Sequence, residues 1–299
     1  MKRVGSFLLK GLLKGVALLP FPVLYFFADI VFLLLFYVVR YRRKLVLKNL
    51  TDSFPDKTEK EVRRIRRRFY RNFADYILET LKLGHISDRA ISKRVSFEND
   101  ELLTRLIASG RSIVVYFSHC GNWEWGTSVS LLHSDNGNVV FGQVYRPLRN
   151  KFTDSYMLGL RSRFGSKSYP KAKVLRELLR ARADGKITVT GFMSDQKPSH
   201  GDRVHILRFL NHPTAVITGT ETLARKLDMA VVYWDIHKDR RGHYTITNRL
   251  IAESLADKPD FYATDSYISM LEKNIERQPD IWLWTHNRWK HKVEMPDSQ

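Results

Sequence analysis

A seventeen-residue apolar run, Val23–Val39, constrains this chain more than any other feature of the sequence. As a helix it would be about 25 Å long, close to the ~30 Å hydrocarbon core of a bilayer. Its many Val, Leu, Ile and Phe side chains each favour insertion by roughly 0.3–0.6 kcal/mol, and their sum exceeds the ~3 kcal/mol cost of the single Asp29. Arg40 and Lys44 follow at once, where a cleaved signal peptide would have small residues. The run therefore predicts a transmembrane anchor, with a soluble core helix as the alternative.

The segment before this run predicts a second helix of a different kind. Residues 4–19 interleave apolar side chains with Lys10 and Lys14, as in an amphipathic helix lying in the membrane interface, and Pro20 ends it. We therefore divide the chain into an N-terminal anchor, residues 1–44, and one larger domain, residues 45–299. Basic residues flank the apolar run on both sides, so the positive-inside rule gives only a faint orientation. Because no other export signal is visible, we expect the larger domain on the cytoplasmic side.

The charge of the chain indicates an anionic partner. The formal net charge is +19, which suits nucleic acid, a phospholipid surface or an acidic substrate. The pattern from Thr58 to Glu61 predicts a capping box, and the helix that follows carries a run of arginines from Arg63 to Arg71. Placed directly after an anchor, such a helix is suited to anionic lipid headgroups. Cys120 is the only cysteine, so neither an internal disulfide nor a Cys-x-x-Cys site is possible.

Beyond residue 110, strand-like and helix-like stretches alternate. Apolar, β-branched segments predict four strands, at Ser112–Phe117, Asn138–Val144, Lys186–Phe192 and Met229–Ile236. Amphipathic segments predict helices at Phe152–Phe164, Ala172–Ala183, Ala215–Leu227 and Tyr262–Arg277. This alternation is typical of an α/β fold: a single domain with a central, partly parallel sheet flanked by helices.

One candidate site follows the first of these strands. His119 lies just beyond the strand and Glu124 five positions later, with Gly121 between them to allow a turn. Sheets of this class place reactive groups where strands end, and a carboxylate on one imidazole nitrogen would leave the other free to accept a proton. We therefore expect Glu124 to orient His119. The spacing does not fit a zinc pair, and no Gly-x-Ser-x-Gly, P-loop or dinucleotide motif is present, so we expect no metal and no nucleotide cofactor.

The sequence around this pair resembles that of a known superfamily. His119-Cys-Gly-Asn122-Trp-Glu124 is similar to the His-x4-Asp/Glu signature of the lysophospholipid-type acyltransferases, in the form found in the lipid A secondary (lauroyl and myristoyl) acyltransferase branch. Further blocks of that branch are matched in order along nearly the whole chain. They are Val144–Asn150 followed by Asp154, Arg161-x-Arg163-x-Gly165, Met193–Gln196, Phe209–Thr214 with Gly219, and Trp282–Lys290.

The resemblance implies a function and a set of site residues. It implies that His119 is the general base for a lipid hydroxyl, that Glu124 supports it, and that an acidic acyl-carrier protein is the acyl donor, with no other cofactor. It implies an anionic lipid A precursor as acceptor and a location at the cytoplasmic face of the bacterial inner membrane. We expect the substrate to be bound by polar residues of the matched blocks, namely Asn122, Arg146, Asn150, Arg163, Asp195 and Gln196.

Three alternatives remain open at this point. Related enzymes acylate lysophospholipids, phosphatidylinositol mannosides or amino-acid lipids with a similar pair, and some use acyl-CoA. Cys120, next to His119, could act as a nucleophile. A non-enzymatic nucleic-acid-binding protein would also be basic, but no such motif is visible and a bilayer anchor argues against it, so we expect no nucleic acid. We expect the tryptophans Trp282 and Trp284 to lie in the core.

Overall fold

A central sheet organises the chain. The computed structural model describes the backbone of residues 2–295 and the side chains of residues 9–295. Seven strands form the main sheet in the order β1-β9-β8-β2-β5-β3-β4, and β6 and β7 form a separate antiparallel hairpin. Among the described strands of the main sheet, only β8 and β9 pair antiparallel. The strands are β1 Val95–Glu98, β2 Ile113–Phe117, β3 Val139–Tyr145, β4 Lys167–Pro170, β5 Ile187–Met193, β6 Val204–Phe209, β7 His212–Ile217, β8 Ala230–Arg240 and β9 His243–Ala252.

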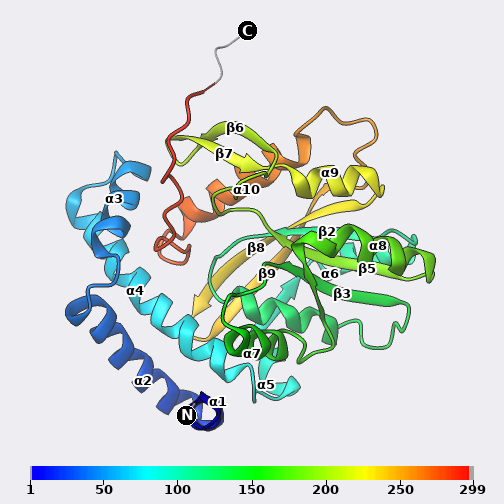
Figure 1. Cartoon of the computed structure of the whole chain (residues 1–299). Helices are drawn as coiled ribbons and strands as arrows, with labels where there is room; N and C mark the ends of the chain where they lie inside the picture. Colours follow the sequence, from blue (N-terminus) through cyan, green and yellow to red (C-terminus); the bar gives the residue numbers. More distant parts are fainter. Residues whose placement is uncertain (1, 296–299) are drawn as a thin grey trace.

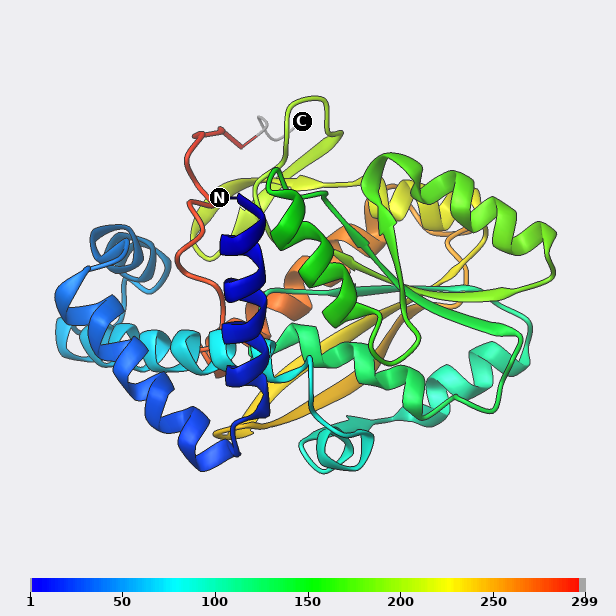
Figure 2. The ribbon, with the colours of Figure 1, turned by 60° about the horizontal axis from the view of Figure 1, so that its bottom comes forward.

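Helices cover both faces of this sheet, so the predicted α/β class is confirmed, and the sheet predicted as partly parallel is mostly parallel (Figures 1 and 2). Helices α8, α9 and α10 lie on one face, and α6 and the 3-10 helix η2 lie on the other. The helices of this domain are α3 Arg43–Ser53, α4 Glu59–Lys82, α5 Asp88–Ser92, α6 Asp100–Ala108, η2 Trp123–Leu131, α7 Lys151–Arg161, η3 Lys171–Lys173, α8 Val174–Ala183, α9 Gly219–Lys226 and α10 Tyr262–Arg277.

The central strand β2 explains why the core forms here. All five of its residues are buried, as expected for a parallel strand with helices on both faces. Alternate side chains point to opposite faces. Tyr116 stacks on Tyr267 of α10, with ring centroids 4.5 Å apart, whereas Val115 and Phe117 face the η2 side. The strand therefore ends, at Phe117, inside a fully packed sheet, and the residues that follow it emerge at a rigid edge.

The predicted boundaries agree with most of these elements. The four predicted strands correspond to β2, β3, β5 and β8, and three predicted helices correspond to α7, α8 and α10. The capping box is confirmed: the Thr58 backbone amide donates to Glu61 at 2.8 Å, and α4 begins at the next residue. The helix predicted at Ala215–Leu227 is wrong at its start, because Ala215 pairs with Ile206 in the β6–β7 hairpin and the helix begins only at Gly219.

The N-terminal region is helical, as predicted. It forms α1 Lys2–Leu18, α2 Phe21–Leu33 and a π-helical continuation, η1 Leu34–Val38, with Pro20 as the N-cap of α2. The segment Phe21–Val38 has a mean hydropathy of 2.2 and is long enough to cross a membrane by length and composition alone. In the fold, α2 runs alongside α4 and α1 also packs on α4 (Figure 1). The division at residues 44 and 45 stays a prediction, although α1 and α2 both contact the larger domain.

The predicted core tryptophans are confirmed. Trp282 and Trp284 are buried in the irregular tail that follows α10. The tail runs back across the loop after β2, where the backbone of Trp282 bridges to that of Cys120. Trp289 lies half-buried, stacked on His212 with centroids 4.2 Å apart. The tail therefore closes one side of the candidate site.

Candidate active site

The register of two neighbouring parallel strands creates the candidate site. Phe117 at the end of β2 pairs with Met193 at the end of β5. Residues at equal distance beyond the two ends therefore lie opposite each other, and these are His119 and Asp195. The His119 backbone amide donates to Oδ2 of Asp195 at 3.1 Å, and Nδ1 of the imidazole lies 2.8 Å from Oδ1. Asp195 is thus the carboxylate that orients the ring.

The environment of Asp195 keeps it ionised. Its side chain is 1% exposed, and burial alone would raise the pKa. The charge of His119 and hydrogen bonds from His119 and from the Trp282 indole, at 2.9 Å, outweigh burial and lower the pKa of Asp195 below its usual value. A carboxylate in this position accepts the Nδ1 proton, which fixes the tautomer with Nε2 unprotonated. The amide nitrogen of Gln196 lies 3.1 Å from Nε2 and donates to it.

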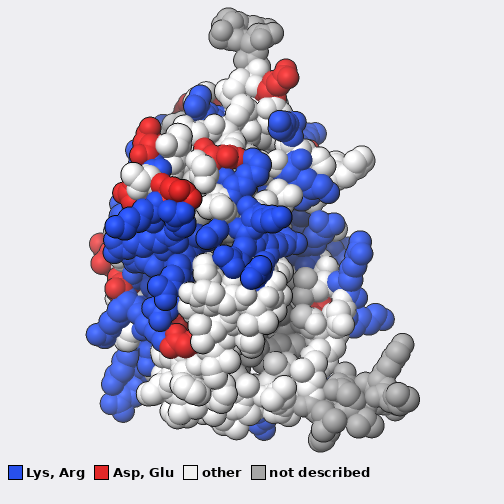
Figure 3. Space-filling view, turned by 90° about the vertical axis from the view of Figure 1, so that its left-hand side faces the viewer, with Lys and Arg blue, Asp and Glu red and all other residues white. Residues whose placement is uncertain are grey.

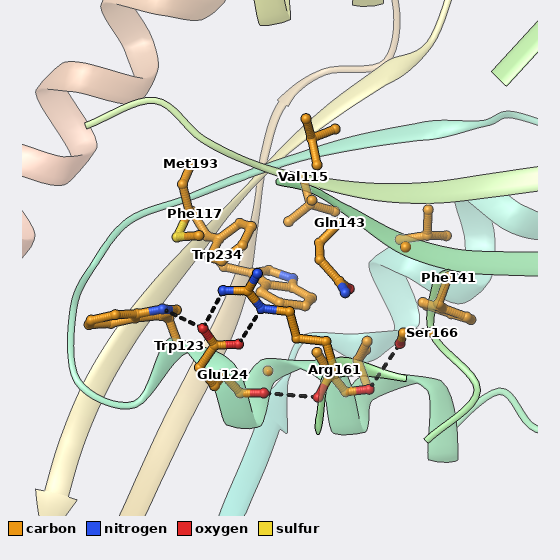
Figure 4. Close-up of a pocket in the computed structure, with 17 residues that line it drawn as sticks. Val115, Phe117, Trp123, Glu124, Phe141, Gln143, Arg161, Ser166, Met193 and Trp234 are labelled. Carbon is orange, nitrogen blue, oxygen red and sulfur yellow. Dashed lines mark hydrogen bonds and ion pairs between the residues drawn. The ribbon is translucent and has the colours of Figure 1, made fainter. Parts of the chain in front are cut away.

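The role predicted for Glu124 as the group that orients His119 is therefore corrected. Glu124 lies in the first turn of η2, and its carboxylate accepts from Arg161 of α7, from Nε at 2.8 Å and from Nη2 at 2.6 Å (Figure 4). It also accepts from the Trp123 indole at 3.3 Å. The side chain is 4% exposed, so its charge is balanced by the guanidinium and not by the imidazole. Any catalytic role of Glu124 stays a prediction, acting through Arg161.

Trp123 connects the two halves of the site. Its ring meets the His119 imidazole edge to face, with centroids 4.9 Å apart, and stacks on Tyr76 of α4 at 4.1 Å. Gly121 makes the turn between them possible, because it has φ +58° and a Cβ there would lie 3.0 Å from the Tyr244 ring. The turn itself was predicted. Its consequence is that Trp123 contacts both groups, His119 through its ring and Glu124 through its indole N–H.

An apolar pocket opens beside this pair, under the η2 face of the sheet (Figure 4). Its free volume is about 40 Å³, so an acyl chain would have to widen it on entry. Glu124, Arg161 and Gln143 are the charged or amide side chains in its wall, and most of the wall is apolar. The apolar and aromatic side chains of the wall are Val115, Phe117, Trp123, Val129, Phe141, Val144, Val189, Met193 and Trp234. His119 is not itself in the wall, but Phe117 and Trp123, which flank it in the chain, are.

The other predicted substrate-binding residues lie in different surroundings. Asn122 is buried and donates to Glu79 of α4 at 3.0 Å. Asn150 caps α7 by accepting from the amides of Phe152 and Thr153. Arg163 donates to the Ile86 carbonyl, which joins the turn after α7 to the loop after α4. These three contacts are structural, and a role in substrate binding stays a prediction for each.

Arg146 lies exposed in the loop after β3 and donates to the Ser199 hydroxyl at 3.1 Å. It therefore links that loop to the one that carries Asp195 and Gln196. Arg161, two positions before the predicted Arg163, is the arginine that faces the pocket. Arg161 is the last residue of α7, whereas Arg163 lies in the turn beyond it, so the spacing in the sequence did not distinguish the two.

The thiol of Cys120 lacks the features of a nucleophile. The residue is fully buried, and burial raises the pKa of its thiol well above the usual range. His286 lies nearby, and its Nε2 accepts from the Lys197 amide at 3.2 Å. Burial is the main reason that the pKa of His286 falls to about 4, so this ring is neutral at physiological pH and supports the Asp195–Lys197 loop.

Comparisons with known proteins identify the family of this chain. The sequence profile of the family described as bacterial lipid A biosynthesis acyltransferase matches residues 1–291. The chain is similar to a lipid A biosynthesis lauroyltransferase of Escherichia coli (strain K12), 25% identical over 287 residues, covering 95% of this chain and 90% of that protein. It is also similar to the palmitoleoyltransferase of the same organism and to a lipid A biosynthesis acyltransferase of Shigella flexneri. Each is 24% identical over 274 residues, covering 91% of this chain and 86% of the relative. The resemblance seen in the sequence is thereby confirmed: the chain is an acyltransferase and belongs to the bacterial lipid A biosynthesis acyltransferase family.

Proposed function

We propose that the protein transfers a fatty acyl group from the thioester of an acyl-carrier protein to a hydroxyl of a lipid A precursor, with His119 as general base. The observation that carries this proposal is the Asp195–His119 pair held beside an apolar pocket. Asp195 fixes the Nδ1 proton, so Nε2 is the atom that can accept a proton. Gln196 occupies Nε2 in the free protein, and we infer that the acceptor hydroxyl displaces its amide.

The proposed reaction balances without a covalent acyl-enzyme. The acceptor oxygen bonds to the thioester carbonyl carbon while its proton passes to Nε2 of His119. When the tetrahedral intermediate collapses, the carbon–sulfur bond breaks and the imidazolium gives the proton to the leaving sulfur. A general base of this kind typically contributes about 10²–10⁴ in rate. The buried Cys120 has no part in these steps.

We assign the stabilisation of the oxyanion to Arg161 and not to Arg146. Arg161 stands at the pocket, with Nε and Nη2 used by Glu124, and a guanidinium has a further N–H-bearing nitrogen to donate. Arg146 is exposed and better suited to a phosphate or to the acidic donor protein. Glu124 then acts by holding the guanidinium in place.

The apolar pocket supports an acyl substrate. Its wall comes mainly from β2, β3, β5 and η2, and a fatty chain that widens the pocket would bury its methylene groups there at about 0.8 kcal/mol each. The net charge of +19 supports an acidic carrier protein and a phosphorylated acceptor. An acyl-carrier protein is cytosolic, so this donor would place the site at the cytoplasmic face of the inner membrane. Acyl-CoA and other lipid acceptors are the alternatives.

The test is to incubate the purified protein with labelled acyl-carrier protein or acyl-CoA and with either a lipid A precursor or a lysophospholipid. We expect label in the lipid A precursor from the carrier protein, with the mass increase of one acyl chain. The variant His119→Ala should lose this product, whereas Cys120→Ala should keep it. Label that enters only the glycerolipid, or undiminished transfer by His119→Ala, would contradict the proposal.

A further inference from the structure

The apolar helix α2–η1 has two faces with different surroundings. One face is buried against α4 and is formed by Leu24, Ala28, Phe32 and Phe36. The opposite face is exposed over its whole length. Its large apolar side chains, each 38–70% exposed, are Val23, Phe26, Phe27, Ile30, Leu33, Leu34, Tyr37 and Val38. The helix is therefore half covered by its own domain and half uncovered.

Hydrogen bonds hold both ends of α2–η1 to the rest of the protein. At the start, the buried ammonium of Lys82 donates to the carbonyls of Ala17 and Leu19, at 2.9 and 2.8 Å. At the end, Arg43 donates to the Phe36 carbonyl at 3.0 Å, and the Tyr70 hydroxyl of α4 donates to the Tyr41 carbonyl.

The middle of the helix is fastened in the same way. The Tyr25 hydroxyl donates to Glu79 of α4 at 2.9 Å. Asp29 pairs with Arg241, which follows β8, at 2.9 Å, and Arg241 also pairs with Asp75 of α4. Asp29, the one acidic residue of the apolar run, is therefore neutralised by the body of the protein and does not face hydrocarbon alone.

These contacts are incompatible with a helix that crosses the bilayer. A crossing α2 would carry α4 with it, and α4 exposes five guanidinium groups, on Arg63, Arg64, Arg67, Arg68 and Arg71. Placing those charges in hydrocarbon is strongly unfavourable. If α4 stayed in water while α2 crossed the bilayer, all of the contacts described above would break, including those of Lys82 and Tyr70. The same contacts are satisfied if α2 lies parallel to the membrane surface.

The distribution of charge on this side of the molecule supports a surface position. Figure 3 shows Lys and Arg side chains gathered next to a broad area without charges. The basic residues next to the apolar helix come from the loop that follows it, from the start of α3 and from α4. Arg40 and Arg42 directly follow η1 and are exposed, Arg43 and Arg66 lie 4.5 and 5.7 Å from the Phe36 ring, and Arg71 lies 5.5 Å from the Phe32 ring. An apolar face bordered by cations matches one leaflet of an anionic bilayer, with acyl chains beneath phosphate headgroups.

We propose that the protein binds a single leaflet in plane: the exposed face of α2–η1 enters the upper acyl-chain region, the adjacent arginines contact the headgroups, and no helix crosses to the other side. Helix α1 then stays on the side of the domain, where Lys10 lies 5.9 Å above the Phe152 ring of α7. Figure 2 shows α1 beside α7. The inference rests on the membrane location of the proposed function but not on its reaction, so it is tested without substrate.

The first experiment asks on which side of the membrane α1 lies. The variants are Lys14→Cys in α1 and Lys60→Cys in α4, both at exposed positions, and a membrane-impermeant maleimide is added to spheroplasts or to inverted vesicles. The unmodified protein is the control, because its Cys120 is fully buried. We expect both new cysteines to react from the same side. Reaction from opposite sides, or recovery of the protein in the soluble fraction, would overturn the proposal.

The second experiment measures depth along α2–η1. A fluorescent label at Phe26→Cys, Ile30→Cys, Leu34→Cys or Val38→Cys is quenched by lipids brominated near the headgroup or near the chain end, in phosphatidylethanolamine–phosphatidylglycerol vesicles. An in-plane helix gives the same ratio of shallow to deep quenching at all four positions. A crossing helix gives the deepest quenching at Ile30 and shallow quenching at Val38, which would overturn the proposal. Neither result depends on acyl transfer, so failure here leaves the proposed reaction standing.

Discussion

Replacing Asp195 by Asn tests which carboxylate serves the base. Oδ2 of Asp195 accepts two N–H groups, from the His119 backbone and from the Trp282 indole, whereas Oδ1 accepts, among the side chains described, only from the imidazole. In Asp195→Asn the amide oxygen should therefore take the Oδ2 position, because the reverse orientation sets an NH2 group against two donors. The NH2 group then faces Nδ1, which must accept. The imidazole is forced into the tautomer with Nε2 protonated, and it cannot act as a base.

The magnitude follows from the loss of general-base catalysis. We expect kcat to fall about 10²–10⁴-fold, equivalent to roughly 3–5.5 kcal/mol in the activation free energy. Removing the carboxylate also removes the charge that stabilises the imidazolium, so the acid limb of the kcat–pH profile should move to lower pH. The variant should remain folded, because Asn buries no charge at this 1%-exposed position.

The matched control is Glu124→Gln, which removes the carboxylate five residues from the base in sequence. Glu124 contacts Arg161 and Trp123, so this change should lower activity through the guanidinium but leave the acid limb where it is. The assay is steady-state transfer measured by product mass across pH, with thermal melting of each variant. Near-native kcat in Asp195→Asn, or an acid limb moved by Glu124→Gln and not by Asp195→Asn, would refute the reasoning.

Three further predictions concern the surroundings of the base. Gln196→Glu places a carboxylate at Nε2 of His119, so the acid limb should move to higher pH; an unchanged profile would exclude contact between Gln196 and the reacting nitrogen. Phe141→Ala widens the apolar pocket, so the accepted acyl chains should lengthen, as read from product mass, at a cost of about 3–5 kcal/mol in stability; unchanged or shorter products would place the chain elsewhere. The pKa of His286 is lowered to about 4 from 6.5, so the unfolded chain binds more protons between these values and the free energy of unfolding falls as pH falls through them. Urea titrations in detergent should show that His286→Gln removes part of this dependence, by less than the full ~3 kcal/mol because the ring is only partly buried; an identical slope in both proteins would contradict the shift.

Much of the fold could be predicted because the pattern of several elements is visible in their own residues. Helix α10 was predicted with its observed bounds, Tyr262–Arg277, since its amphipathic pattern stops before Pro279. Strand β2 was recognised as a short apolar run. Strand β9, His243–Ala252, was missed, although its alternation places Tyr244, Ile246 and Asn248 on one buried face. Its side chains mix polar and aromatic types, and only pairing with β8 shows which set faces the core.

Membrane topology illustrates a different limit of sequence reasoning. Composition alone favours insertion of the apolar run, because it weighs each side chain against lipid and ignores the rest of the chain. The packing of Leu24 and Phe32 on α4 and the pairing of Asp29 with Arg241 enter only in three dimensions. In these contacts the side chains of the apolar run have protein partners in place of lipid. An in-plane position of the helix is therefore an alternative to a crossing one.

The partner of His119 also could not be predicted from the sequence, because the contact forms only in three dimensions. From the sequence we located the loop that carries His119, but we assigned the carboxylate nearest along the chain, Glu124, to the imidazole. In a parallel sheet, the side chain nearest in space is the one at the same offset from the end of the neighbouring strand, so Asp195, seventy-six positions away, reaches the imidazole. Glu124 falls beyond the turn, where the 3-10 helix directs it to Arg161 beneath the sheet. The short spacing of the motif therefore links the base to the mouth of the apolar pocket, and the strand register supplies the carboxylate that orients the histidine.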